Sequence, residues 1–353
     1  MFGRRRRPLL GTAVVIGASR SAARHEMAYQ GQVAAAEQQA AQMQAELQMH
    51  EEQERERRTQ AAINEAIAKE RQRNEQTRLE SGAMANTTEL TGGRAPPIYN
   101  SAPADAKTVR TITLFIHGLG SSSCFYHTII PGLKSSTRCI ALDTPGSGLS
   151  ELGKSEQSIA TIAEDAIGLL DTLNIKEEVI VVGHSVGSTV VNFLAATYPH
   201  RVKAVVLLGP VNPEFAIVPV FEQRIEVIQS DSLETLAKKI PLTATGEKAG
   251  SLQRAFVRTL ILSTSPEGYM SLCHALATAQ PPDYGAINVP LLIITGSDDV
   301  TSPLSGPKEI LEKYGTKKTE KTIQDLSGIG HWHCVEEPDA VEGLIKEFIQ
   351  TIK

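Results

Sequence analysis

Short apolar runs of strand length recur from residue 109 onward and alternate with segments of helical periodicity. The runs span residues 109–116, 138–142, 179–182, 203–208, 290–295 and 322–326. Runs of this length that are separated by helices are typical of strands buried on both faces of a parallel sheet. The pattern therefore predicts the α/β class, with a mostly parallel sheet.

Two segments between these runs carry a clear helical spacing. Residues 159–173 repeat apolar positions every three or four residues, and residues 186–198 do the same until Pro199 ends the pattern. We expect such helices on both faces of the sheet. Residues 109–353 then form one domain.

About residues 212–286 interrupt the alternation of strands and helices. They read as several short helices between the fourth and fifth predicted strands. An insertion at the carboxyl ends of parallel strands is where a lid over a binding site belongs. We expect this helical lid to line a pocket with apolar side chains such as Phe215, Val218, Val220, Phe221, Ile225 and Met270.

The amino-terminal part has a different composition. Residues 1–25 contain six arginines and no acidic residue, followed by a Gln/Glu/Arg-rich stretch at 27–80 and a Gly- and Pro-containing linker at 81–108. The segment 1–26 is basic and apolar, which favours a mitochondrial leader or a membrane-surface contact over a secretory signal. Residues 27–80 predict a long helix, either a coiled coil that self-associates or a charged helix that is partly disordered.

Composition and charge limit the classes of partner and cofactor that the chain is expected to bind. The chain has 41% apolar residues and a net charge of −5, and the core carries no basic surplus, so nucleic acid is not expected as a partner. His331 and His333 lack further ligands at metal-site spacing, and the four cysteines lack paired close spacing. We expect no metal, reduced thiols and an intracellular location, with the compartment left open.

The strongest chemical motif is Gly183-His184-Ser185-Val186-Gly187, which follows an apolar strand and opens a helix. That context turns a loose G-x-S-x-G match into a nucleophile elbow. The glycines allow a tight turn that holds the serine in a strained conformation with its hydroxyl exposed. Ser185 is the expected nucleophile.

A serine hydroxyl needs a base within hydrogen-bond reach, and the base needs an anion to fix its tautomer. His331 follows the last predicted strand and is the expected base. Asp298 and Asp299 both follow the run 290–296, and the spacing to Pro303 favours Asp299 as the acid. His333, two residues after His331, is expected to be structural or a pocket wall.

The oxyanion formed by serine attack requires preorganised donors. Val186, directly after the nucleophile, supplies one backbone N–H. The loop 117–120 follows the first predicted strand and supplies the other, and we assign it to Leu119.

Five motifs in register resemble the α/β-hydrolase superfamily over about residues 109–353: His117-Gly118, residues 143–150, the elbow 183–187, residues 296–303, and Gly330-His331 with Glu336 and Pro338. The branch they resemble contains 3-oxoadipate enol-lactonases, small carboxylesterases and meta-cleavage-product hydrolases. The resemblance implies the α/β-hydrolase fold. It also argues against epoxide hydrolases and haloalkane dehalogenases, which carry Asp in place of Ser185.

The sequence thus predicts a serine hydrolase that cleaves a small hydrophobic ester, lactone or related carbonyl compound through an acyl-enzyme, without a cofactor. Two alternatives stay open. One is a carbon–carbon bond hydrolase that uses the same three residues. The other is a low-turnover binding or scaffold protein on the same fold, because a fold alone does not imply a function.

Overall fold

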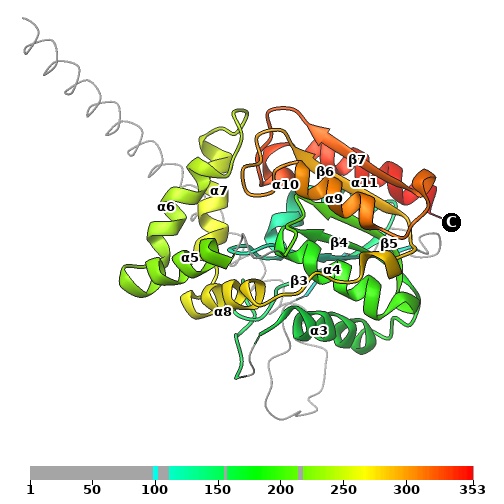
Figure 1. Ribbon diagram of the computed structural model, residues 1–353, viewed down its shortest axis with the longest axis horizontal. Coiled ribbons are helices and arrows are strands. Elements are labelled where there is room, and N and C mark those ends of the chain that lie inside the picture. The colour runs from blue at the N-terminus through cyan, green and yellow to red at the C-terminus, as the bar shows by residue number, and fades with distance from the viewer. Residues whose placement is uncertain (1–97, 102–110, 155–156, 214–217, 353) are drawn as a thin grey trace, which may run out of the picture. The chain divides into compact units, whose positions relative to one another are not determined.

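The computed structural model describes residues 98–101, 111–154, 157–213 and 218–352 (Figure 1). The chain divides into two units, residues 1–85 and 86–353, and the fold below belongs to the second. The predicted leader, coiled coil, membrane contact and self-association concern residues outside the described ranges. Within the described ranges, no helix combines the length and the apolar character that crossing a membrane requires.

A seven-stranded sheet with the order β1-β3-β2-β4-β5-β6-β7 forms the centre of this unit. All neighbouring strands are parallel except β1, which pairs antiparallel with β3. The sheet consists of β1 (Ile98–Ser101), β2 (Ile112–Ile116), β3 (Arg138–Leu142), β4 (Val179–His184), β5 (Val202–Leu208), β6 (Leu291–Gly296) and β7 (Lys321–Leu326). The α/β class and the mostly parallel sheet are confirmed.

Two strands depart from the sequence expectation. The strand β1 falls inside the range 81–108 that we interpret as a linker. The strand β7 is not buried on both faces, because it forms the edge of the sheet and its residues alternate between half-buried and exposed. By contrast, all six residues of β4 and of β6 are buried, as expected for central strands.

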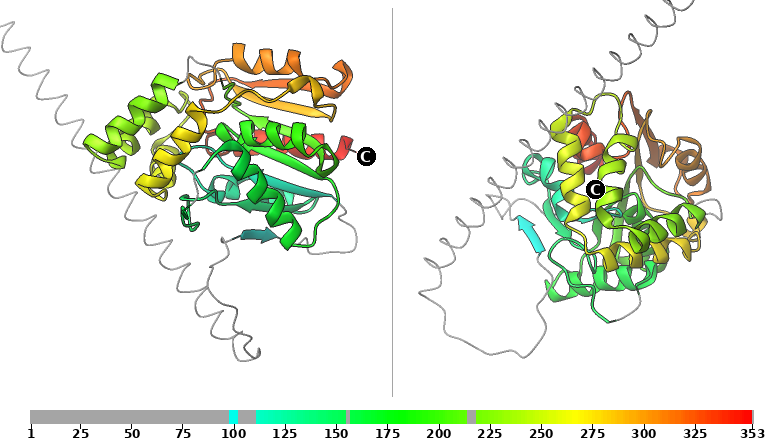
Figure 2. Two further views of the ribbon diagram at one scale, coloured as in Figure 1. Left: turned by 60° about the horizontal axis from the view of Figure 1, so that its bottom comes forward. Right: turned by 90° about the vertical axis from the view of Figure 1, so that its left-hand side faces the viewer.

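Helices cover both faces of the sheet (Figures 1 and 2). On one face lie α3 (Ile159–Thr172), α4 (Val186–Thr197) and α9 (Ser305–Lys313), and on the other lie α2 (Ile130–Leu133) and α11 (Pro338–Thr351). The helix α3 begins where Ser158 and Thr161 exchange hydrogen bonds in a capping box. The helix α4 ends just before Pro199, so both predicted helices agree with the structure to within one residue.

The predicted insertion between β5 and β6 consists of four helices that lie beyond the carboxyl ends of the strands (Figure 1). They are α5 (Val218–Ser230), α6 (Leu233–Thr243), α7 (Ser251–Leu262) and α8 (Pro266–Ala277). Shorter helices complete the fold: η1 (Ser123–Thr128), η2 (Pro199–Arg201), η4 (Tyr284–Ala286), η5 (Lys318–Glu320) and α10 (His333–Glu336).

Among the apolar residues expected to line the pocket, two neighbours on α5 differ in exposure. Phe221 is buried, whereas its neighbour Val220 is 47% exposed. Successive residues of a helix point about 100° apart, so one faces the interior while the other faces solvent. Val220 is therefore not a buried residue of the insertion, and Phe215 lies outside the described residues.

Candidate active site

Ser185 lies at the junction of β4 and α4, in a backbone conformation that L-residues rarely adopt. Its φ is 54° and its ψ is −118°, and among the described residues only Asn174 shares a positive φ without being glycine. The turn is held by the Ser185 N–H, which donates to the Leu208 carbonyl at 2.9 Å. Such strain persists only where the surroundings enforce it, and it concentrates at functional sites.

The glycine after the elbow serine is required by close packing. A Cβ on Gly187 would lie 2.1 Å from the carbonyl oxygen of Ile116, at the end of β2. No other residue fits between α4 and this strand. The first turn of α4 consequently sits directly against β2, next to the loop that follows this strand.

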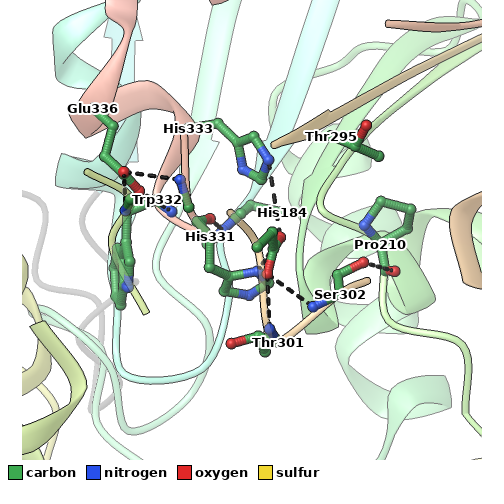
Figure 3. Close-up of polar contacts among 12 residues, drawn as sticks. His184, Pro210, Thr295, Thr301, Ser302, His331, Trp332, His333 and Glu336 are labelled. Atoms are coloured by element: carbon green, nitrogen blue, oxygen red, sulfur yellow. Dashed lines mark hydrogen bonds and ion pairs between the residues drawn. The ribbon is translucent and has the colours of Figure 1, made fainter. Parts of the chain in front are cut away.

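His331 lies in the loop between β7 and α10 and is hydrogen-bonded to Asp299, which follows β6. Its Nδ1 is 2.8 Å from Oδ2 of Asp299. The other carboxylate oxygen, Oδ1, accepts the backbone N–H groups of Thr301 at 2.9 Å and Ser302 at 2.8 Å (Figure 3). Both side chains are buried. The structure thus brings together two of the three residues that the sequence places in a triad.

The electrostatic surroundings of Asp299 keep its carboxylate ionised. Burial acts to raise its pKa, but His331, His333 and the Ser302 amide outweigh burial, so the pKa lies well below its ordinary value. An ionised carboxylate beside Nδ1 fixes the proton of His331 on that nitrogen and leaves Nε2 free to accept one.

Asp298 points away from this pair. Its carboxylate accepts the Glu247 N–H at 3.1 Å and the Ser297 hydroxyl at 2.9 Å. The Asp298 carboxylate thereby connects the loop after β6 to the segment between α6 and α7. Of the two adjacent aspartates, the structure therefore places only Asp299 against His331.

His184 links the elbow to the histidine loop. Its Nε2 lies 2.8 Å from the carbonyl oxygen of His331, and the two rings are 4.9 Å apart between centroids. Burial, together with His331 and His333, lowers the pKa of His184 well below its ordinary value, so the ring is neutral and Nε2–H is the donor. This hydrogen bond joins the residue directly before Ser185 to the His331 loop.

The two amides expected to bind an oxyanion flank Ser185. A Cβ on Gly118 would lie 2.9 Å from Cβ of Ser185, so the loop after β2 passes directly over the elbow. Among the described residues, no acceptor receives the N–H of Leu119 or of Val186. Unused amides next to a nucleophile are what an oxyanion site requires.

His117 orients the Leu119 amide, a role that the sequence reasoning missed. Its Nδ1–H donates to the Gly118 carbonyl at 2.8 Å, and its Nε2 accepts the Thr144 N–H at 3.1 Å. Burial lowers the pKa of His117, which keeps the ring neutral and able to do both. Because a trans peptide is planar, fixing the Gly118 carbonyl also fixes the direction of the Leu119 N–H.

Glu336 is a second contributor for which the sequence reasoning gave no role. Its Oε2 accepts the N–H groups of Gly246 at 2.7 Å and Gly330 at 2.9 Å, and its Oε1 accepts that of Trp332 at 2.9 Å (Figure 3). The His331 N–H itself donates to the Ala244 carbonyl at 2.8 Å. Together these hydrogen bonds join the loop that carries His331 to the connection between α6 and α7.

Replacing Glu336 with glutamine is expected to lower the free energy of unfolding by about 2–3 kcal/mol. The amide NH₂ would face backbone N–H groups, so at least one hydrogen bond to a charged acceptor is lost. Urea unfolding followed by the fluorescence of Trp332, the single tryptophan, measures the change. Glu347→Gln on the exposed side of α11 is the matched control. Equal stability of the two variants would contradict the role assigned to Glu336.

Comparison with known proteins agrees with this fold. A family model described as alpha/beta hydrolase fold matches residues 113–338. A 2-hydroxy-6-oxo-6-phenylhexa-2,4-dienoate hydrolase from Comamonas testosteroni is 26% identical over 249 residues, covering 66% of this chain and 84% of that protein.

Two solved structures share the fold at lower identity. A thermophilic esterase from Thermogutta terrifontis, with malate bound, has a TM-score of 0.65 and 19% identity, covering 76% of this chain and 99% of that chain. An enol-lactonase from Burkholderia xenovorans LB400 has a TM-score of 0.64 and 21% identity, covering 72% of this chain and 98% of that chain.

Proposed function

This chain belongs to the alpha/beta hydrolase fold family, and from its site we propose that it is a serine hydrolase acting on a small hydrophobic ester, lactone or related carbonyl compound. The observation that carries the proposal is the buried Asp299–His331 hydrogen bond of 2.8 Å, together with a serine at φ 54° whose neighbour His184 is bonded to the His331 carbonyl. A strained serine next to an oriented imidazole is the arrangement that nucleophilic catalysis needs.

The proposed reaction has two halves. In the first, His331 Nε2 accepts the Ser185 proton while Oγ bonds to the substrate carbonyl carbon, and the N–H groups of Leu119 and Val186 bind the oxyanion. Collapse breaks the bond to the leaving oxygen, which takes the proton from His331. In the second half, water activated by His331 attacks the acyl-enzyme and releases the acid and Ser185.

Cleavage of a carbon–carbon bond by the same residues is the second candidate. It is supported by the similarity to the dienoate hydrolase of Comamonas testosteroni. Parallel assays with p-nitrophenyl esters of rising chain length, enol-lactones and dienoate ring-cleavage products separate the two candidates. Turnover of the dienoates alone would favour the second candidate.

Covalent labelling tests the nucleophile directly. We expect a fluorophosphonate probe to add one equivalent to the full-length protein and none to Ser185→Ala, because only an activated serine reacts at neutral pH. Ser230→Ala, on the exposed surface of α5, controls for loss of a serine and should label fully. A folded wild-type chain that does not react would instead support the low-turnover binding protein.

A further inference from the structure

His333 is a buried histidine that the proposed reaction does not use. It lies at the start of α10 with no exposed surface, and neither ring nitrogen has a hydrogen-bond partner within the part of the chain that the structure describes. Buried polar groups are nearly always hydrogen-bonded, so each exception calls for a physical reason. A ring placed this close to a reactive centre points to a role in that centre.

The ring of His333 is directed at the carboxylate of Asp299. Its Nε2 is 4.0 Å from Oδ2, the same oxygen that bonds to His331 at 2.8 Å (Figure 3). The partner oxygen Oδ1 already accepts two backbone amides. Oδ2 accepts one hydrogen bond and has room for a second. Hydrogen bonds in catalytic sites are often long without substrate and tighten in the complex.

Gly209 provides the space in which these groups meet. A Cβ at this position would lie 2.7 Å from Cε1 of His333, 3.0 Å from Oδ2 of Asp299 and 3.1 Å from Nδ1 of His331. Any larger residue after β5 would separate the two imidazoles from the carboxylate. Asp299, His331 and His333 can therefore meet only because the residue after β5 has no side chain.

Burial keeps His333 a neutral donor despite the charges that face it. The titratable groups that face it are Asp299, Asp325, His331 and His184. Burial lowers the pKa of His333 to about 4, while Asp299, the His331 backbone and Asp325 act in the opposite direction. At neutral pH the ring thus carries one N–H and one lone pair, and the carboxylate favours the proton on Nε2.

We propose that His333 is a positioning residue that donates Nε2–H to Oδ2 of Asp299 in the substrate complex, holding the carboxylate in register with His331. The inference rests on the proposed function. A carboxylate held by an additional donor rotates less and has less negative charge to share with His331. Removing the donor leaves a looser carboxylate that holds the proton on His331 more strongly.

Kinetics of two variants of the full-length protein test this role. His333→Leu should lower kcat for a p-nitrophenyl ester on the order of 10-fold, which corresponds to the loss of about one hydrogen bond to a charged group. The acid limb of its kcat/KM profile should also move to higher pH by about half a unit. His333→Gln places an amide N–H near the position of Nε2. This variant should therefore recover most of the wild-type kcat and most of the wild-type position of the acid limb. A purely structural role would lower activity without moving the limb.

Nuclear magnetic resonance of the wild-type protein gives a readout that needs neither turnover nor a folded variant. With ¹⁵N-labelled histidine, the ring nitrogens of His333 should show the Nε2–H tautomer at neutral pH. The Nδ1–H tautomer overturns the proposal, as does an unshifted acid limb in folded His333→Leu. If Ser185→Ala retains activity, the proposed function fails while the tautomer measurement still decides the placement of His333.

Discussion

Replacing His331 with glutamine is expected to lower kcat for ester hydrolysis on the order of 10⁶-fold, the scale seen when a triad base is removed. Glutamine fills most of the space of the ring but has no nitrogen that can accept a proton and then return it. The Ser185 hydroxyl would remain protonated and unreactive at neutral pH. Steady-state and single-turnover kinetics with p-nitrophenyl esters measure the loss of acylation directly.

The matched control for this variant is His200→Gln, in the exposed helix η2. It makes the same chemical change far from the elbow, and we expect its kcat to equal that of the wild type. Both variants should show the same thermal unfolding midpoint to within a few degrees. Activity of His331→Gln within tenfold of the wild type would mean that another group removes the serine proton.

Replacing Asp299 with asparagine should lower kcat on the order of 10⁴-fold. The asparagine amide can donate to Nδ1 of His331, which drives the imidazole proton to Nε2, the atom that must accept from Ser185. The pKa of Asp299 lies well below its ordinary value, so the wild-type carboxylate stays ionised throughout the acid range. Its protonation therefore does not limit the wild-type rate on the acid side.

Asp298→Asn is an exact chemical match one residue away. The Asp298 carboxylate contacts Glu247 and Ser297 instead of a histidine, so its loss should change kcat by no more than about twofold. Measuring both variants under the same conditions decides between the two aspartates. A larger loss for Asp298→Asn would reverse the assignment of the acid.

Local patterns account for most of what the sequence predicts correctly. The apolar runs and the three- and four-residue spacing identify six strands and the helices α3 and α4. Residues that face the core are apolar, and in strands and helices they recur at regular intervals along the sequence. Pro199 marks the end of α4 because it cannot continue the helix. The glycines around Ser185 mark the elbow because they allow the tight turn between the strand and the helix.

Features that depend on residues far apart in the sequence cannot be predicted from local sequence patterns. The strand β1 has only four residues, and its pairing with β3 is a tertiary contact. Asp298 and Asp299 share nearly the same neighbours in the sequence, and the Thr301 and Ser302 amides distinguish them only in three dimensions. Glu336 binds an amide 90 residues earlier in the chain, at Gly246.

The attachment of the helical insertion to the His331 loop couples the position of the α6–α7 connection to that of the imidazole. The Ala244 carbonyl and the Gly246 amide of this connection are bonded to His331 and Glu336, so a displacement of the connection would also displace the imidazole. A substitution at residues 244–246 would therefore alter the orientation of His331 from outside its own loop.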